Sequence, residues 1–176
     1  LPLTQILKEM NIYSNNEMAE ILARNLGGPQ ITSQIAAKSA DVPQAEIQMV
    51  NGSGLGVENR ISPRAICAML TTIDRFLQPH KLSVDDIFPV SGREHRGTLQ
   101  ARKLPLGTAI KTGTLNTVSA LAGRMPTRNK GQVWISLING GDSVEGFRVQ
   151  PEALLAPYSK CMGIHPPLRV GPCRNA

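Results

Sequence analysis

Three short segments in the second half of the chain constrain the fold most. Residues 108–114, 118–125 and 132–139 each have the composition of a β-strand, and only short turn segments separate them. Strands that follow one another so closely in sequence pair antiparallel. The segment from residue 108 to residue 139 therefore predicts a three-stranded antiparallel sheet.

The first 80 residues show helical patterns instead. Ser14-x-x-Glu17 has the form of a capping box, with Ser14 as the helix cap, and apolar residues at helical spacing follow it. Helices beside an antiparallel sheet predict a mixed α/β fold of the α+β kind. The predicted helices cover residues 14–27, 31–40, 43–50 and 62–77, with a last one from about 144 to 162, and a glycine-rich turn lies at 51–56.

The length of 176 residues suits one domain with a single hydrophobic core. With 41% hydrophobic and 18% charged residues, the chain is too apolar to be disordered, and no apolar run is long enough to span a bilayer. Only 3% of the residues are aromatic, which argues against a single-strand nucleic-acid binder despite the net charge of +6. We therefore expect no nucleic-acid partner and no membrane span.

The positive charge is concentrated in the second part of the chain. Residues 1–60 carry four Lys/Arg and six Asp/Glu, whereas residues 61–176 carry fifteen and seven. Two interpretations remain open, a surface for an anionic ligand or polymer and a solvated face without a partner. Eight basic residues and a single acid, Glu94, lie close together in one stretch: Arg93, Arg96, Arg102, Lys103, Lys111, Arg124, Arg128 and Lys130.

The three cysteines do not form a metal-binding pattern. Cys67, Cys161 and Cys173 lack a C-x-x-C pairing, and the three histidines are scattered, so we expect no metal site. Cys161 and Cys173 could close a short loop in an oxidising compartment. Cys67 lies among apolar residues of a predicted helix and is interpreted as a small buried hydrophobe.

Three short motifs stand out, although each has an ordinary structural explanation. Ser14-Asn15-Asn16 fits a helix start, and Asn51-Gly52-Ser53-Gly54 fits a turn. Lys111-Thr112-Gly113-Thr114 is less usual, because a lysine and a glycine inside a strand forgo packing. A solvated edge strand explains the lysine, but the glycine indicates a backbone that a ligand approaches closely.

In this order the three motifs resemble those of the serine penicillin-binding proteins. The resemblance is strongest to their D-alanyl-D-alanine carboxypeptidase/endopeptidase branch, the low-molecular-mass class C type, and covers Met10 to about Gly141. It implies a C-terminal part of a penicillin-binding transpeptidase-like fold in the periplasm or another extracytoplasmic place. It also implies cleavage of stem peptides ending in D-Ala-D-Ala through an acyl-enzyme, without a metal or organic cofactor.

The resemblance implies three catalytic residues. Ser14 would relay a proton between the lysine base and the leaving amine, and Asn16 would bind a backbone amide of the substrate. Lys111 would supply positive charge from across a cleft, within one water-mediated hydrogen bond of the Ser14 hydroxyl.

The strand after Lys111 would bind the substrate. By resemblance, Thr112 and Thr114 offer hydroxyls to the terminal carboxylate, and Gly113 leaves room for the substrate to pair along the strand. The backbone N–H of Thr114 would be one donor of the oxyanion hole.

The sequence lacks the S-x-x-K motif that supplies the nucleophile and base in this family. The nearest segment, Thr108-Ala109-Ile110-Lys111, begins with threonine and lies on a predicted strand. The chain is thus expected to be a C-terminal part, with its domain at 1–163 and a tail at 164–176. Its nucleophile would come from a missing N-terminal segment, so that alone it would be inactive and would not bind β-lactams covalently.

Two departures and one competing function follow from the same comparison. The family usually has Asp where Asn51 stands and often an aromatic residue where Arg124 stands, which puts substrate contacts of either in doubt. The absent S-x-x-K also allows a non-catalytic module that binds peptidoglycan peptides or has a structural role.

The resemblance also predicts association. In the resembled fold the strand at 132–139 lies beside the first strand of a five-stranded sheet, and the helix bearing S-x-x-K lies in the core. Without them, this strand would have an open edge and an apolar hollow would remain. We expect the chain to be stable only with an N-terminal partner chain or with a copy of itself.

Overall fold

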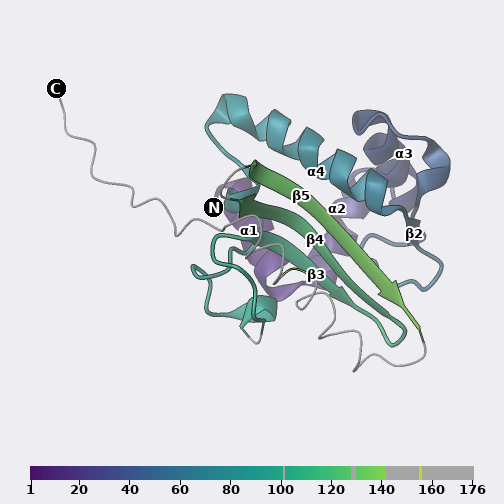
Figure 1. Ribbon diagram of the computed structural model, residues 1–176. Coiled ribbons are helices and arrows are strands. Elements are labelled where there is room, and N and C mark those ends of the chain that lie inside the picture. The colour runs from purple at the N-terminus through teal and green to yellow at the C-terminus, as the bar shows by residue number, and fades with distance from the viewer. Residues whose placement is uncertain (101, 128–129, 142–154, 156–176) are drawn as a thin grey trace.

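The computed structural model describes residues 1–100, 102–127, 130–141 and 155. Of the last helix predicted at about 144–162, only Leu155 is among these residues, and the Cys161–Cys173 pairing, the predicted domain boundary at 163 and the tail at 164–176 lie outside them. The described part has the mixed architecture predicted from the sequence, with helices packed around an antiparallel sheet (Figure 1).

The main sheet contains three antiparallel strands in the order β3-β4-β5, which confirms the prediction. Its register sets Lys111 opposite Ala122 and Gly113 opposite Ala120. The strands are β3 (Ala109–Thr114), β4 (Val118–Thr127) and β5 (Gly131–Gly140).

Four α-helices and a small second sheet form the rest of the described chain. Ser62 caps the longest helix by accepting a hydrogen bond from the Ala65 amide at 3.0 Å. None of the described helices is long and apolar enough to cross a membrane. The elements are α1 (Leu3–Tyr13), α2 (Asn16–Asn25), α3 (Pro29–Ser39), α4 (Pro63–Leu77), β1 (Ile47–Gln48), β2 (Arg60–Ile61) and four short 3₁₀ turns, η1 (Gln44–Glu46), η2 (Gln78–His80), η3 (Val84–Asp86) and η4 (Gly97–Leu99).

Two sequence predictions were wrong in this region. The helix predicted at 43–50 is the 3₁₀ turn η1 followed by β1, because Ile47 pairs with Ile61 and is fully buried. Ser14 does not cap α2, since the Asn15 side chain accepts the hydrogen bond from the Met18 amide at 2.9 Å. Helix α1 had not been predicted.

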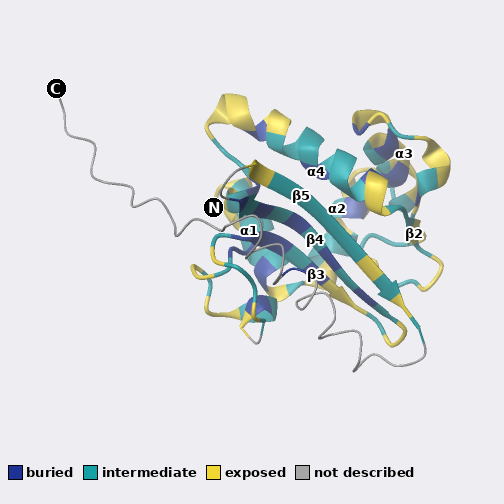
Figure 2. Ribbon diagram, viewed as in Figure 1, coloured by how far each residue is buried: buried dark blue, intermediate teal, exposed yellow. Residues whose placement is uncertain are grey.

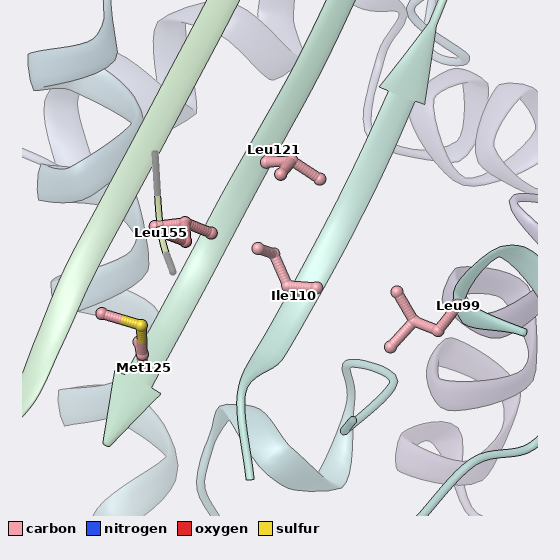
Figure 3. Close-up of a cluster of buried hydrophobic side chains, with 5 residues drawn as sticks. All are labelled: Leu99, Ile110, Leu121, Met125 and Leu155. Carbon is pink, nitrogen blue, oxygen red and sulfur yellow. The ribbon is translucent and has the colours of Figure 1, made fainter. Parts of the chain in front are cut away.

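Each face of the main sheet packs against a separate apolar cluster. On one face Ile110, Leu121 and Met125 pack with Leu99 and Leu155 (Figure 3). Burial is concentrated in β3 and β4, where β4 alternates between buried and partly buried residues (Figure 2).

The opposite face of the sheet carries α4, which runs beside β5 (Figure 1). Val84, Val90 and Ala109 are buried there, with Ile73 of α4 and Trp134 of β5 packed against them. Side chains on a strand alternate between the two faces, so Lys111 lies on the same face as Ala109, toward the far end of the strand. Near Ala109 this face is therefore covered by α4, and near Lys111 it forms a wall of a cavity.

Candidate active site

A cavity of about 920 Å³ lies between the helical part of the chain and the sheet. Its walls come mainly from α1, α2, the loop at 51–59 with β2, and the adjoining ends of β3, β4 and β5, and one residue each of α4 and η4 completes them. Besides apolar side chains from several of these elements, the walls include every residue that the resemblance assigned to the site: Ser14, Asn16, Lys111, Thr112, Gly113 and Thr114.

Ser14 and Lys111 are in direct contact, although 97 positions separate them in sequence. The Lys111 Nζ donates to Ser14 Oγ at 2.7 Å and to the carbonyl oxygen of Thr112 at 2.5 Å. This arrangement is closer than the water-mediated contact expected from the resemblance. A hydroxyl and an amine at this distance can exchange a proton directly.

The backbone around Ser14 explains its position. Ser14 ends α1 with φ +52°, in the left-handed region that non-glycine residues rarely adopt, and its N–H donates to the Met10 carbonyl. The next residue, Asn15, caps α2, and Asn16 is the first residue of that helix. This tight junction turns the chain between two helices and directs Ser14 into the cavity.

The substrate-binding residues of the resemblance occupy different environments. Thr112 is only 7% exposed, whereas Gly113 and Thr114 are exposed at the end of β3. A Cβ at Gly113 would meet only the Ala120 Cβ, at 3.7 Å, which leaves the strand open to a ligand above it. Of the two threonine hydroxyls, that of Thr114 is therefore the more accessible.

The cavity is positively charged. Lys111 and Arg60 are the charged residues among its described lining, and no carboxylate accompanies them there. Burial lowers the pKa of Lys111 from 10.5 to about 8, because the ammonium is costly to desolvate. The site thus combines a positive potential for an anionic group with an amine that can release its proton near neutral pH.

The Lys111 pKa makes stability depend on pH. Between pH 8 and pH 10.5 the unfolded state keeps a proton that the folded state has released, so the free energy of unfolding should rise with pH by about 3 kcal/mol. Urea denaturation of the chain and of Lys111→Met across this range measures the difference. The account of Lys111 is wrong if the two proteins show the same pH dependence.

Glu20 holds the loop that forms one wall of the cavity. Its carboxylate accepts hydrogen bonds from the amides of Gly52, at 3.2 Å, and Ser53, at 2.9 Å. Hydrogen bonds from the Ser53 side chain and from both amides lower the pKa of Glu20. Gly52 is required here, because a Cβ would overlap the Ala23 side chain. Glu20 was not among the residues predicted from sequence, although it lies one helical turn after Asn16.

The two departures from the family pattern have local structural roles. Asn51 Oδ1 accepts from the Gly54 amide at 3.1 Å and from Asn59 Nδ2 at 2.9 Å, which stabilises the turn. Arg124 is mostly buried, forms an ion pair with Asp85 and does not line the cavity. These contacts account for both residues without a ligand.

The positive stretch predicted from sequence is partly neutralised. Arg93 and Arg124 both pair with Asp85, and Arg96 pairs with Glu9. Of the eight basic residues in the stretch, the cavity lining includes Lys111. Arg128 lies outside the described residues. The three paired arginines are less suited to bind an anionic polymer, whereas Lys111 supplies its charge inside the cavity.

The backbone of Gly97 lies in close contact with the end of α1. It has φ +67°, and a Cβ there would overlap the carbonyl oxygen of Ile12, two residues before Ser14. We expect Gly97→Ala to lower the free energy of unfolding by about 2–4 kcal/mol, because strain and overlap act together. Gly131 is a matched control with the same φ and open space around it. Urea denaturation should show a smaller loss for Gly131→Ala, and equal losses would contradict the close approach.

Comparison with known proteins places these features in a family. A model of the D-Ala-D-Ala carboxypeptidase 3 (S13) family matches residues 1–154. Carboxypeptidase DacB of Mycolicibacterium smegmatis is 29% identical over an alignment 180 residues long. The alignment covers 91% of this chain and 38% of that protein. The match to the family model covers all three motifs.

Solved structures share the fold. The penicillin G-acylated Bd3459 predatory endopeptidase of Bdellovibrio bacteriovorus, in complex with immunity protein Bd3460, matches 92% of this chain with a TM-score of 0.80 and 25% identity. Penicillin-binding protein 4 of Haemophilus influenzae, in complex with a β-lactam, matches 92% with a TM-score of 0.70 and 26% identity. The chain covers 45% and 41% of these two proteins, respectively, and thus spans less than half the length of these relatives.

Proposed function

Because the chain belongs to the D-Ala-D-Ala carboxypeptidase 3 (S13) family, we propose that it forms part of the active site of a serine-type D-alanyl-D-alanine carboxypeptidase or endopeptidase. The substrate is a peptidoglycan stem peptide that ends in D-Ala-D-Ala. The observation that carries the proposal is the 2.7 Å contact between Lys111 Nζ and Ser14 Oγ inside a positively charged cavity.

In the proposed reaction, a serine attacks the carbonyl carbon between the two D-alanines. The new Ser O–C bond forms an acyl-enzyme as the C–N bond breaks, and water then hydrolyses the ester. Ser14 passes a proton to the leaving amine, with Lys111 beside it to stabilise the charge that moves. Asn16 binds a substrate amide from the start of α2.

Strand β3 binds the other end of the substrate in this proposal. The terminal carboxylate lies near Lys111 and accepts hydrogen bonds from the Thr112 and Thr114 hydroxyls. The Thr114 amide stabilises the oxyanion, and Gly113 lets the peptide approach the strand. These steps need proton transfer and fixed hydrogen-bond donors, and no metal or organic cofactor takes part in them.

In this reaction the nucleophilic serine comes from a segment outside this sequence, since no S-x-x-K motif occurs within it. That segment is an N-terminal portion of a longer chain or a separate partner chain. The penicillin G-acylated relative and the β-lactam complex of penicillin-binding protein 4 support acylation by β-lactams once the nucleophile is present. The place of action is the cell envelope outside the cytoplasm, where peptidoglycan lies.

The absent S-x-x-K favours one second candidate, a non-catalytic module that binds peptidoglycan peptides. In that function the cavity would hold a D-alanyl peptide without cleaving it. Positive charge at Lys111 and the open backbone at Gly113 serve both functions equally. Only a measurement of catalysis by the assembled site therefore distinguishes the peptidase from the non-catalytic module.

A chimera tests the proposed function. In it, this chain replaces the matching portion of carboxypeptidase DacB of M. smegmatis. We expect the chimera to release D-alanine from a peptide that ends in D-Ala-D-Ala, and this chain alone to release none. A folded chimera that binds the peptide without releasing D-alanine, while the parent relative releases it, would favour the non-catalytic module.

A further inference from the structure

Lys8 connects helix α1 to the segment that leads into β3. Its Nζ donates to the carbonyl oxygens of Asp85, at 2.8 Å, and Phe88, at 2.5 Å, and contacts Glu94 Oε1 at 2.8 Å. These three acceptors match the three N–H groups of an ammonium. The Lys8 and Glu94 side chains are only 17% and 14% exposed, respectively, so the ion pair is largely shielded from solvent.

Glu94 continues the connection to the strand that carries Lys111. Its second carboxylate oxygen accepts a hydrogen bond from the Val90 amide. Val90 forms an antiparallel bridge with Ala109, the first residue of β3, and Ala109 lies two residues before Lys111. A continuous path of polar contacts therefore joins α1 to β3.

This path joins the two elements that position the central contact of the site, because α1 ends at Ser14 and β3 carries Lys111. Lys8 lies on α1, and the last turn of that helix leads directly to Ser14. Asn11 adds a second contact between the same elements, because its Nδ2 donates to the Ile87 carbonyl at 2.8 Å. A small shift of α1 relative to β3 would separate a hydroxyl and an amine that must lie within hydrogen-bond distance.

We propose that Lys8 and Glu94 are a positioning pair, which holds α1 against β3 and thereby sets the distance between Ser14 and Lys111. This inference rests on the proposed function for its catalytic meaning, and on the contacts of the chain itself for its geometry. Neither residue lines the cavity, so the pair acts through Ser14 and Lys111 and does not touch a substrate.

The chain offers a matched control for this pair. Glu9 and Arg96 also join α1 to the loop after residue 90, with Arg96 Nη2 at 2.5 Å from Glu9 Oε1. Their side chains are 37% and 53% exposed, so solvent screens the interaction. Glu9→Gln should therefore leave the site geometry unchanged, whereas Glu94→Gln and Lys8→Met should disturb it.

The test follows the titration of Lys111 by NMR of the whole chain with ¹⁵Nζ-labelled lysine. Lys111→Arg identifies the signal. In the parent chain and in Glu9→Gln, Lys111 should titrate at about 8. In Lys8→Met and Glu94→Gln, its midpoint should move toward the ordinary lysine value of about 10.4, because a displaced ammonium gains water. Lys8→Arg should keep the low midpoint.

In the chimera, Lys8→Met and Glu94→Gln should lower the acylation rate by a factor of about 10 or more, because the fixed geometry is lost, whereas Glu9→Gln should not lower it. Folding is checked by circular dichroism. An unchanged Lys111 midpoint in folded Lys8→Met or Glu94→Gln would overturn the proposal, as would loss of folding in both, which would make the pair merely structural. The titration does not require enzymatic activity, so a failure of the proposed function would leave this result interpretable.

Discussion

Replacing Lys111 by alanine is expected to slow penicillin acylation of the chimera by a factor of about 10²–10⁴, the range typical for loss of an acid–base group. Lys111 contacts the proposed proton relay directly and supplies positive charge in a cavity without a lining carboxylate among the described residues. Burial of the Lys111 ammonium is unfavourable in the folded protein, so the substitution should not lower the free energy of unfolding at pH 7. Acylation kinetics and the thermal midpoint separate the two effects.

Lys130→Ala is the control for this substitution. Lys130 is an exposed lysine in the turn before β5 and does not line the cavity. Its removal should change neither acylation nor stability measurably. If Lys111→Ala lowers the thermal midpoint sharply while acylation continues at the parent rate, Lys111 is a structural residue and its proposed role is wrong.

The isolated chain is expected to sediment as a dimer or larger species at low micromolar concentration. Strand β5 pairs with β4 on one side, and no described strand pairs with its other edge. Backbone donors and acceptors on an open edge invite pairing with another chain. The cavity of about 920 Å³ beside it exposes further apolar surface, including Ile138, which is 37% exposed. Association would cover both features.

Two substitutions on β5 test this expectation by analytical ultracentrifugation. Ile138→Lys places a charge on the apolar wall of the cavity and should shift the chain toward monomer. Gln132→Lys adds the same charge at an exposed position of the same strand and should have a weaker effect. A parent chain that is monomeric and unfolds cooperatively would show that the described strands and helices suffice alone.

The sheet could be predicted because its signals are local. Strands β3, β4 and β5 lie within two residues of their predicted bounds, since composition and turn residues define them without help from distant contacts. The segment 43–50 could not be predicted in this way. Its β1 residues pair with Arg60 and Ile61, and this distant pairing overrides a helical pattern.

The helix junction at Ser14 illustrates a different limit. Helix α1 begins after Pro2 without a side-chain cap and ends at a serine with positive φ, so it lacks the usual start and stop signals. The capping box at Ser14 was a reasonable prediction, but Asn15 is equally suited to cap a helix and takes that role. The left-handed backbone at Ser14 has no sequence signature.

That these residues form one site could be predicted only from the resemblance to a family. No periodicity in the chain indicates that Ser14 meets Lys111, because the contact joins distant elements. The contacts of Lys8 with Glu94 and of Glu20 with the loop at 51–56 are likewise long-range and leave no local pattern. Charged residues of this kind resemble ordinary surface residues in sequence, and only the fold shows which of them are shielded.

The most direct test of the central claim is intact mass spectrometry after incubation with penicillin G. If this chain supplies Ser14, Asn16 and Lys111 but no nucleophile, the isolated chain should gain no covalent adduct. The chimera with carboxypeptidase DacB should gain one penicillin per molecule under the same conditions. A covalent adduct on the isolated chain would contradict the account, as would a folded chimera that stays unmodified while the parent relative is acylated.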